Sequence, residues 1–378
     1  MRILGAILRI THIGPDSQFV RFAVEVFESV APGANEQIIL TDSGKGPLRF
    51  PIEHGRVRVV SSHVRGALRI PFEIRSSDMI VAHSMTPHAA IAFETARPGT
   101  IRVWSGWGFD YYGDDQSPDT GLLGESTLAL SRSLGILVRG GFDVRAFRRV
   151  VHRAAVKTDF FSAPIPDDLA VLKERFPKFH GNYSQINYAS VHDTFALGAE
   201  LDSGVGNILV GNSASLANNH LEIFDILSQQ DLTGRRIVVP LSYGNTAYRN
   251  AIVVRGTELF GSAFTPLIDF LPLNEYVSVV ASCSVVVMNH KRQQAIGNIG
   301  SALYHGAHVF LDEASPTVGF LRSRGACIQT TSQLEADGLP RAPLSAEAVA
   351  TNRRVLETFW GADQVAKNVA ALVGQLTR

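Results

Sequence analysis

The sequence predicts an α/β protein with two doubly wound, Rossmann-like domains, each built on a parallel sheet. Short apolar runs alternate with helical patterns in both halves of the chain, which is typical of parallel sheets covered by helices on both faces. At 378 residues the chain also exceeds one ordinary hydrophobic core. The predicted parts are a first domain over residues 1–190, a polar, glycine-bearing linker over 191–206, a second domain over 207–345, and a helical segment over 346–378 that packs across the interdomain region.

The first half opens with an apolar run, Ile3–Ile10, that predicts the first strand, and a polar loop is expected over His12–Gln18. Phe19–Val30 has apolar residues at helical spacing and is followed by Pro32 and Gly33, so it predicts a helix. Five further strands are predicted, each flanked by turn or helix signals. They are Gln37–Leu40, Val57–Val60, Met79–Ala82, Ile101–Val103 and Ile136–Val138.

The second half repeats this alternation and closes with a segment of helical pattern, Ser345–Arg378. The strands predicted in it are Ile208–Val210, Arg236–Pro240, Leu267–Phe270, Val279–Met288 and His308–Leu311.

Composition excludes several classes of protein. The formal net charge is zero, which argues against a general affinity for nucleic acid. Cys283 and Cys327 lie in apolar surroundings, so a reduced, cytoplasmic protein is expected. The longest apolar stretch, Tyr276 to Met288, is well short of the roughly 20 residues that a spanning helix needs. Arg9 interrupts the apolar N-terminus, so we predict a strand there and not a secretion signal.

Polar, glycine-containing loops follow three strands of the second half. Parallel strands end at one edge of a sheet, where open α/β folds bind ligands, so these loops are expected to meet. Amides at a helix start bind phosphate, although a simple capped turn remains an alternative for the first loop. An arginine in one of these loops would bind a diphosphate, and a tyrosine could stack on the base of a nucleotide. The candidate ligand-binding residues are Gly211, Asn212, Ser213, Asn219, His220, Tyr243, Gly244, Arg292, Gln293, Gln294, Gly297 and Asn298.

Several segments resemble those of glycosyltransferase family 56. They are ILVGNSASLANNH, IVVPLSYGNTAY, the stretch around LNEYVSVVASC, and RQQAIGNIGSALYHGAHVFLD, in the family's order. In the first half, Trp107, Gly108 and Asp110 match the family pattern W-G-x-D. The similarity is densest from Ile208 to about Phe320 and thins in the first half, where Asp114–Asp119 departs from the pattern.

This resemblance implies the two-domain fold called GT-B and a TDP- or UDP-linked deoxyamino sugar as donor. The family's type member transfers Fuc4NAc to the undecaprenyl-linked lipid II of enterobacterial common antigen. We therefore predict a transferase that moves a Fuc4NAc-like sugar to a glycan acceptor, expected to be polyprenyl-linked, in bacterial surface polysaccharide or O-antigen synthesis. Two alternatives stay open: a GT-B nucleotide-sugar epimerase, which needs no acceptor site, and a non-catalytic nucleotide-sugar-binding protein.

Glycosyl transfer requires a stabilised leaving diphosphate and a positioned acceptor hydroxyl, ideally with a base nearby. Asp110, among aromatic side chains, and His12, after the first strand, are the candidate bases. The alternative for Asp110 is a helix cap in a loop held by buried tryptophans, and a lone histidine is often structural. The candidate acceptor-binding residues are Gly14, Asp16, Trp104, Trp107 and Tyr111.

Neither a metal nor a cofactor is expected. The sequence has no Asp-x-Asp triplet and no histidine–cysteine pattern with zinc spacing. Arg292 and helix-start amides can stabilise a leaving diphosphate without metal. The adjacent pair Asp167–Asp168 is interpreted as solvated.

Basic residues gather between Arg132 and Lys157, with Phe142, Phe147 and Val150 among them. This stretch could contact an anionic membrane, which would place the protein peripherally on the inner face of the plasma membrane. The alternative is an ordinary exposed helix of the first domain.

Overall fold

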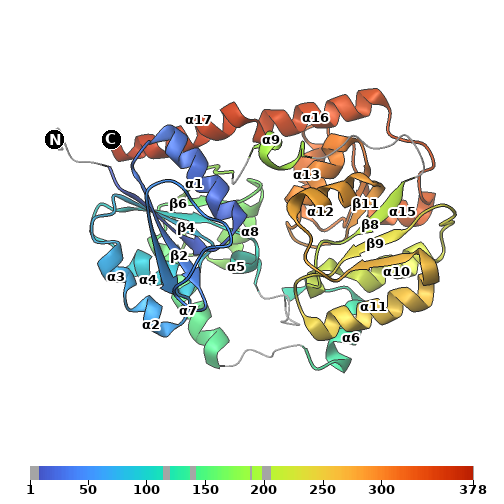
Figure 1. The fold of residues 1–378 in the computed structure, drawn as a ribbon, viewed down its shortest axis with the longest axis horizontal. Coiled ribbons are helices and arrows are strands. Elements are labelled where there is room, and N and C mark those ends of the chain that lie inside the picture. Colours follow the sequence, from blue (N-terminus) through green and yellow to red (C-terminus); the bar gives the residue numbers. More distant parts are fainter. Residues whose placement is uncertain (1–7, 114–119, 137–141, 188–189, 198–205, 378) are drawn as a thin grey trace. The chain divides into compact units, whose positions relative to one another are not determined.

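The computed structural model describes residues 8–113, 120–136, 142–187, 190–197 and 206–377. The chain divides into two compact units, each with its own parallel sheet (Figure 1). Unit 1 comprises Met1–Tyr112, Gly140–Ser190 and Ala362–Arg378, and unit 2 comprises Gly113–Arg139 and Val191–Gly361. Among the described residues, no helix is long and apolar enough to cross a bilayer.

Unit 1 holds a seven-stranded sheet in the order β3-β2-β1-β4-β5-β6-β7, with every neighbouring pair parallel. Its strands are β1 (Ile10–Pro15), β2 (Asn35–Thr41), β3 (Arg56–Ser61), β4 (Met79–His83), β5 (Ile101–Ser105), β6 (Phe160–Ser162) and β7 (Asn182–Tyr183). Its helices are α1 (Gln18–Val30), α2 (Val64–Ala67), α3 (Ile70–Glu73), α4 (Pro87–Thr95), α5 (Phe109–Tyr112), α7 (Phe142–Lys157), α8 (Asp168–Arg175) and α17 (Ala362–Val373), followed by the 3-10 turn η4 (Gly374–Thr377).

The first strand differs from its prediction. The predicted strand Ile3–Ile10 lies mostly outside the described residues, and β1 instead runs through the expected loop. His12 is polar, which favoured a loop, yet it is buried within the sheet. Helix α1 begins where Ser17 accepts a hydrogen bond from the amide of Phe19, which is a normal N-cap.

Unit 2 holds a six-stranded parallel sheet in the order β10-β9-β8-β11-β12-β13. Its strands are β8 (Asn207–Val210), β9 (Ile237–Pro240), β10 (Phe264–Leu267), β11 (Cys283–Met288), β12 (His308–Leu311) and β13 (Gln329–Thr330). Its helices are α6 (Glu125–Ser133), α9 (Val191–Thr194), α10 (His220–Ser228), α11 (Thr246–Phe260), α12 (Leu273–Ala281), α13 (Ile296–His305), α14 (Pro316–Arg322), α15 (Thr331–Asp337) and α16 (Ala346–Trp360), with 3-10 turns η2 (Leu216–Asn218) and η3 (Gly261–Ala263).

Two strand predictions in unit 2 require correction. The run predicted as one strand, Val279–Met288, is the end of α12 followed by β11, because apolar residues cover both a helix face and a buried strand. The strand predicted at Leu267–Phe270 ends at Leu267. Cys283 is buried as expected, whereas Cys327 is exposed.

A segment of the first half belongs to unit 2. Ile136 belongs to the core of unit 2, and Leu123 and Leu130 pack against that core. The rest of the predicted strand Ile136–Val138 lies outside the described residues. Asn219 accepts a hydrogen bond from the Gly124 amide at 2.8 Å and donates to the Leu122 carbonyl at 3.0 Å. The expected continuous first domain over 1–190 therefore differs from unit 1, which lacks this segment.

The C-terminal helices are shared between the units. Helix α16 packs against α13 in unit 2, and α17 packs against α1 in unit 1. Val369, Leu372 and Leu376 join the core of unit 1 with Ile10 and Phe27. The last residues of the chain therefore complete the hydrophobic core of the first unit.

A buried pair of histidines lies in the sheet of unit 1. His12 Nδ1 is 3.0 Å from His83 Nε2, and His12 Nε2 is 3.2 Å from Asn35 Oδ1. Burial lowers the pKa of His12 from 6.5 to about 4, against the opposing effects of the Asn35 bond and the Glu28 charge. Burial, followed by the nearby His12, also lowers the pKa of His83 well below its usual value. Both rings are therefore neutral in the folded protein at neutral pH.

We predict that stability falls as pH falls from 6.5 towards 4. In this window the unfolded chain binds a proton at His12 that the folded chain does not, so acid favours unfolding. His12 alone accounts for a loss of up to about 3 kcal/mol. Urea unfolding across the window measures the effect, and His12→Gln should show a shallower pH dependence. A flat stability profile in the natural protein would contradict the prediction.

Candidate functional site

The strand order of unit 2 places a topological switch between β8 and β11. From β8 the chain moves outward to β9 and β10, and it then returns to β11 on the other side of β8. Loops that leave the carboxyl ends of such strands diverge, and ligands bind in the crevice that this leaves in open α/β sheets. The loops after β8, β9 and β11 carry most of the residues predicted to bind a ligand.

The loop after β8 is shaped by Gly211 and Asn218. Gly211 has φ +69°, and a Cβ there would lie 2.6 Å from Asn218 Oδ1, so glycine is required. Asn218 Oδ1 accepts a hydrogen bond from the Asn212 amide at 2.8 Å. Asn218 Nδ2 donates to Ser213 Oγ at 3.1 Å, and Ser213 is buried. Asn212 is partly exposed in this loop, as is Ser215.

The loop after β9 is joined to the loop after β8. The Ala214 amide donates to the Tyr243 carbonyl at 2.7 Å, and the Asn245 amide donates to the Ala214 carbonyl at 3.0 Å. A Cβ at Gly244 would lie 2.4 Å from Ala214 C, so this glycine permits the backbone contact instead of admitting a ligand. The Tyr243 side chain is 58 % exposed and its hydroxyl accepts a hydrogen bond from Asn212 Nδ2 at 3.1 Å.

The loop after β11 also contacts the side-chain amide of Asn212. His290 Nε2 lies 3.2 Å from Asn212 Oδ1 and 3.0 Å from Asn218 Oδ1, and Gln294 Nε2 donates to Asn212 Oδ1 at 3.0 Å. Burial, followed by the charge of Arg292, lowers the pKa of His290 well below its usual value. The neutral ring donates from Nε2, because both of its neighbours there are amide oxygens.

These contacts define a cluster at the switch point of unit 2. We call it the β8–β11 cluster, and it consists of Asn212, Asn218, Tyr243, His290, Arg292 and Gln294.

Helix α13 begins directly after the cluster. Ala295 has φ +60° and turns the chain into the helix, and among the described residues no side chain caps its first amides. Gly297 is exposed, and a Cβ there would meet no described atom within 4 Å. Asn298 donates to the Tyr276 hydroxyl at 2.8 Å, which holds α13 against α12. A helix start with accessible amides next to an arginine is suited to bind an anion.

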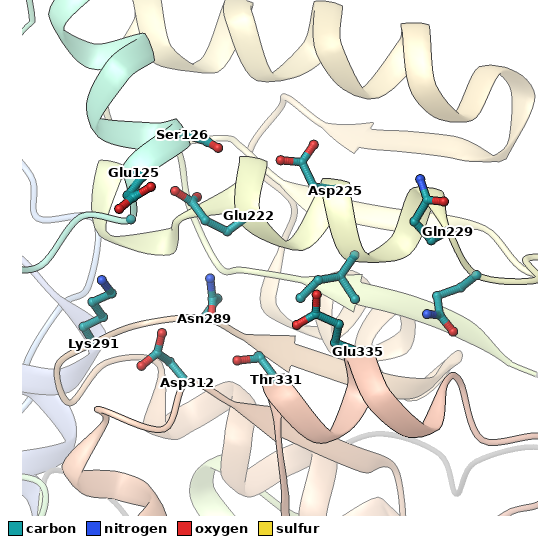
Figure 2. A pocket seen from close by; sticks show the side chains of 13 residues that line it. Glu125, Ser126, Glu222, Asp225, Gln229, Asn289, Lys291, Asp312, Thr331 and Glu335 are labelled. Carbon is teal, nitrogen blue, oxygen red and sulfur yellow. The ribbon is translucent and has the colours of Figure 1, made fainter.

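A cavity of about 570 Å³ adjoins the loop after β11 in unit 2. Figure 2 shows polar side chains from α10, α15 and the ends of β11 and β12 around it. Five of its lining residues are acidic and one, Lys291, is basic. Burial raises the pKa of Asp312 in its wall. The surplus of carboxylates disfavours a diphosphate there, although carboxylates do accept hydrogen bonds from sugar hydroxyls. Its acidic residues are Glu125, Glu222, Asp225, Asp312 and Glu335.

The residues predicted to bind a ligand thus divide into two groups. Asn212, Tyr243 and Gln294 are partly or fully exposed at the carboxyl ends of β8, β9 and β11, and Arg292, which is 8 % exposed, lies beside them. Gly297 and Asn298 lie at the start of α13. The others support the loops from inside. Asn219 and His220 are fully buried, and His220 Nδ1 lies 3.1 Å from the Tyr248 hydroxyl. The buried supporting residues are Gly211, Ser213, Asn219, His220 and Gln293, whereas Gly244 is exposed and acts through its close approach to Ala214.

In unit 1 the structure gives Asp110 a structural role. Its carboxylate accepts hydrogen bonds from Trp104 Nε1 at 2.7 Å, the Met85 amide at 2.8 Å and the Trp107 amide at 2.9 Å. The residue is 6 % exposed. Burial raises its pKa, and these hydrogen bonds act in the opposite direction. Asp110 holds the loops after β4 and β5 together, so the expectation of an accessible base does not fit this geometry.

The other residues predicted in the first half are also mostly internal. His12 is fully buried in β1 with both ring nitrogens engaged, so it cannot contact a substrate as a base in this structure. Trp104 and Tyr111 are fully buried and pack edge-to-face on Phe161. A Cβ at Gly14 would lie 2.9 Å from His83 Cβ, so its small size permits strand packing.

Asp16 and Trp107 remain partly exposed near the carboxyl ends of β1 and β5. Asp16 accepts the amides of Arg49 at 2.6 Å and Phe50 at 3.0 Å. Trp107 lies edge-on to Phe19, with ring centroids 6.1 Å apart, and Phe19 is 39 % exposed. Phe109 in the same loop is 50 % exposed. Phe19 and Trp107 therefore form an aromatic pair near the carboxyl ends of β1 and β5, and Phe109 is a further exposed aromatic side chain after β5.

Sequence reasoning assigned no binding role to Asn218 and His290, which hold the β8–β11 cluster together. Their one signal is position, since each follows a buried strand within a few residues. It also interpreted Asp167–Asp168 as solvated, whereas Asp168 is fully buried and accepts hydrogen bonds from Tyr111 at 2.5 Å and Tyr112 at 2.6 Å. Among the described residues, no group of three or more histidine, cysteine, aspartate or glutamate side chains is placed to hold a metal.

We predict that Asp110→Asn mainly destabilises the protein. An asparagine replaces one acceptor oxygen by an N–H₂ donor, so at least one of the three N–H groups that bind Asp110 loses its acceptor. Leaving a buried donor unsatisfied lowers the free energy of unfolding by about 1–3 kcal/mol. Thermal unfolding and turnover should be measured together, with Asp159→Asn as the control, because that carboxylate is 44 % exposed. Unchanged stability with turnover lowered by about two orders of magnitude or more would instead identify Asp110 as a base.

Comparison with known proteins confirms the resemblance to family 56. Residues 184–329 match the model of a 4-alpha-L-fucosyltransferase family, glycosyl transferase group 56. This segment contains the β8–β11 cluster and the start of α13.

The fold is shared with solved glycosyltransferases. Sucrose-phosphate synthase from Thermosynechococcus elongatus aligns with a TM-score of 0.70 at 10% identity, covering 98% of this chain and 99% of that one. HepE from Anabaena, solved in complex with UDP-glucose, aligns with a TM-score of 0.63 at 11% identity, and the alignment covers 97% of this chain and 99% of that one. A glycosyltransferase from Rickettsia africae aligns with a TM-score of 0.63 at 12% identity, and the alignment covers 98% of this chain and 99% of that one. The predicted GT-B fold is therefore confirmed, and the match of residues 184–329 to a glycosyltransferase family, within that fold, supports a glycosyltransferase.

Proposed function

We propose that unit 2 binds a nucleotide-activated deoxyamino sugar, Fuc4NAc-like, carried by TDP or UDP. The observation that carries this proposal is the convergence of Arg292, Asn212 and Tyr243 at the switch point, beside the open start of α13. The match to a fucosyltransferase family over the same residues supports a deoxy sugar.

The diphosphate of such a donor fits the start of α13. Arg292 provides a permanent positive charge and a planar fork of N–H donors, which suits phosphate oxygens. The first amides of α13 and its dipole add positive potential at the same place. Because the leaving diphosphate gains charge as the glycosidic bond breaks, these groups stabilise the transition state more than the ground state.

The base and the sugar have different requirements. Tyr243 is exposed and its hydroxyl is fixed by Asn212, so its ring offers a stacking surface for a pyrimidine. Hydroxyl groups of the ribose or sugar suit the acidic cavity beside Lys291, which disfavours the diphosphate itself. This division of charge would fix the direction in which the donor lies.

Transfer to a glycan acceptor, expected to be polyprenyl-linked, is the second half of the proposal. The aromatic pair Phe19 and Trp107 in unit 1 suits the C–H face of a sugar ring, and the exposed Phe109 is a further candidate. Asp16 is a partly exposed carboxylate near the end of β1 that could bind an acceptor hydroxyl. The family resemblance supports a role in bacterial surface polysaccharide synthesis, with the protein acting at the inner face of the plasma membrane.

An epimerase would use the same donor site without an acceptor, and a non-catalytic protein would bind the donor without turnover. Product analysis separates the three functions. Sugar transfer that depends on an added acceptor supports the transferase, interconversion of the free nucleotide-sugar supports the epimerase, and binding alone supports the third.

We predict that TDP or UDP raises the melting temperature in the absence of divalent metal. Binding at about 100 times the dissociation constant stabilises the folded state by about 2.7 kcal/mol. Arg292→Gln should weaken binding by about 10- to 100-fold, because it removes a charge-assisted contact to phosphate.

Two controls make this experiment specific. Arg255→Gln removes the same charge from the exposed face of α11 in the same unit and should leave the shift unchanged. Addition of EDTA should also leave the shift and the turnover unchanged, since the proposed site uses an arginine and helix amides instead of a metal. An equal shift in Arg292→Gln and the natural protein would refute the phosphate site, and loss of turnover with EDTA would refute metal independence.

A further inference from the structure

Three large apolar side chains are exposed on one short stretch of unit 1. Val64 is 79 % exposed, Leu68 is 70 % exposed and Phe72 is 66 % exposed. They lie on α2, at its C-cap and on α3. Contiguous exposed apolar side chains on a folded protein mark a contact surface for a partner or a membrane.

The backbone places these three side chains on a common face. Leu68 and Arg69, which separate α2 from α3, both have right-handed helical dihedral angles. The Leu68 amide bonds to the Val64 carbonyl, and the Phe72 amide bonds to the Arg69 carbonyl. Residues four apart on a helical path lie one above the other, so Val64, Leu68 and Phe72 form a row.

The opposite side of the same stretch packs into unit 1. Gly66, Ala67 and Ile70 are buried. A Cβ at Gly66 would lie 1.8 Å from the Ser61 carbonyl oxygen, so only glycine allows this close approach to β3. The stretch therefore has a buried face that fixes it in place and a second apolar face that points to solvent.

Arginines lie along the exposed row. Arg65, Arg69 and Arg75 are exposed, and the Arg75 guanidinium lies 5.0 Å from the centre of the Phe72 ring. Between Ser62 and Ser76 the sequence contains one acidic residue, Glu73, which is paired with Arg58 at 3.1 Å and with Arg69 at 3.5 Å. We call this feature the α2–α3 surface, formed by Val64, Arg65, Leu68, Arg69, Phe72 and Arg75.

Helix α7 extends the positive charge. Both α2 and α3 pack against α4, and α7 packs against α4 as well, so these helices belong to one layer of unit 1 (Figure 1). The described side chains of α7 include exposed Arg149, Arg153 and Lys157, and Val156 is 49 % exposed. Glu94 of α4 pairs with Arg153 at 3.2 Å and Lys157 at 3.9 Å, and Arg149 adds a further cation.

We propose that the α2–α3 surface docks on an anionic phospholipid bilayer. Its apolar row would enter the boundary between headgroups and acyl chains, while the flanking arginines contact lipid phosphates. The occupant is identified by charge complementarity, because apolar side chains alternate with cations and the one acid of the stretch is neutralised. The proposal rests on the location given under the proposed function, the inner face of the plasma membrane, and names the surface that contacts the lipid. Because docking requires neither nucleotide nor acceptor, it can be tested apart from the donor site.

Flotation with vesicles made of equal parts phosphatidylglycerol and phosphatidylcholine tests the proposal. The natural protein should float at low salt, and Val64→Ser, Leu68→Ser and Phe72→Ser combined should lower binding by about tenfold or more. Ile268→Ser with Phe270→Ser is the matched control, because these side chains of unit 2 are 41 % and 60 % exposed. The control should bind as the natural protein does.

The arginines are tested in the same way. Arg65→Gln, Arg69→Gln and Arg75→Gln together should lower binding by about fivefold for each cation that reaches the headgroups, and added salt should weaken binding in parallel. The same three changes at Arg255, Arg322 and Arg354 of unit 2 serve as the control. Melting temperatures and the shift with UDP, measured on every variant, show that each is folded and separate this result from a failure of the donor site.

Insertion of the apolar row into the bilayer can be measured directly by tryptophan fluorescence. In Phe72→Trp, brominated lipids should quench tryptophan fluorescence beyond the level of the natural protein, whereas Phe270→Trp should show no added quenching. The proposal is overturned if the natural protein fails to float on anionic vesicles, or if the serine variant floats equally well. Self-association that the serine variant abolishes, without vesicle binding, would instead assign the surface to contact between copies of the chain.

Discussion

The side-chain amide of Asn218 is the contact on which the geometry of unit 2 depends. Its oxygen accepts hydrogen bonds from the Asn212 amide and from His290 Nε2, and its nitrogen donates to Ser213. These bonds join the ends of β8 and β11 where the two strands' chain paths diverge. Because Asn218 is fully buried, breaking them would leave several polar groups without partners at a cost of about 1–3 kcal/mol each. The open side chains of Asn212 and Tyr243 are therefore held in place from within.

A second constraint comes from the segment that enters unit 2 from the first half of the chain. Asn219 binds this segment at Leu122 and Gly124, and it also donates to the Asn289 carbonyl at 3.0 Å. Glu222 accepts the Thr127 amide at 2.9 Å on the same side of α10. The loop after β11 is thus supported from both sides, by Asn218 near the switch point and by Asn219 near the acidic cavity. Side chains that bind no ligand position those that are suited to do so.

Charge is distributed unevenly within unit 2. Arg292 and the amides of α13 create positive potential at the switch point, whereas the neighbouring cavity carries five acidic residues. A diphosphate is favoured at the first place and disfavoured at the second, while hydroxyl groups are accepted at both. Such a pattern orients an extended ligand without a large apolar pocket, because electrostatic complementarity selects position and direction. Unit 1 shows a different arrangement, in which His12, His83 and Asp110 are engaged internally and Phe19 and Phe109 are left at the surface.

The sequence by itself determined the alternation of strands and helices, the GT-B fold and the family resemblance, because these follow from local periodicity and from ordered motifs. The position of Asn212, Tyr243, Arg292 and Gln294 at one edge of a sheet could also be predicted from the sequence, since parallel strands end at the same edge. Only the tertiary structure decided which polar side chains face outward. His12 and Asp110 were predicted as bases because of their chemistry and position, yet both satisfy buried partners contributed by strands and loops distant in sequence. Likewise, the exposed row of Val64, Leu68 and Phe72 has the spacing of an ordinary buried helix face. Burial depends on what packs against a residue, and local sequence does not contain that information.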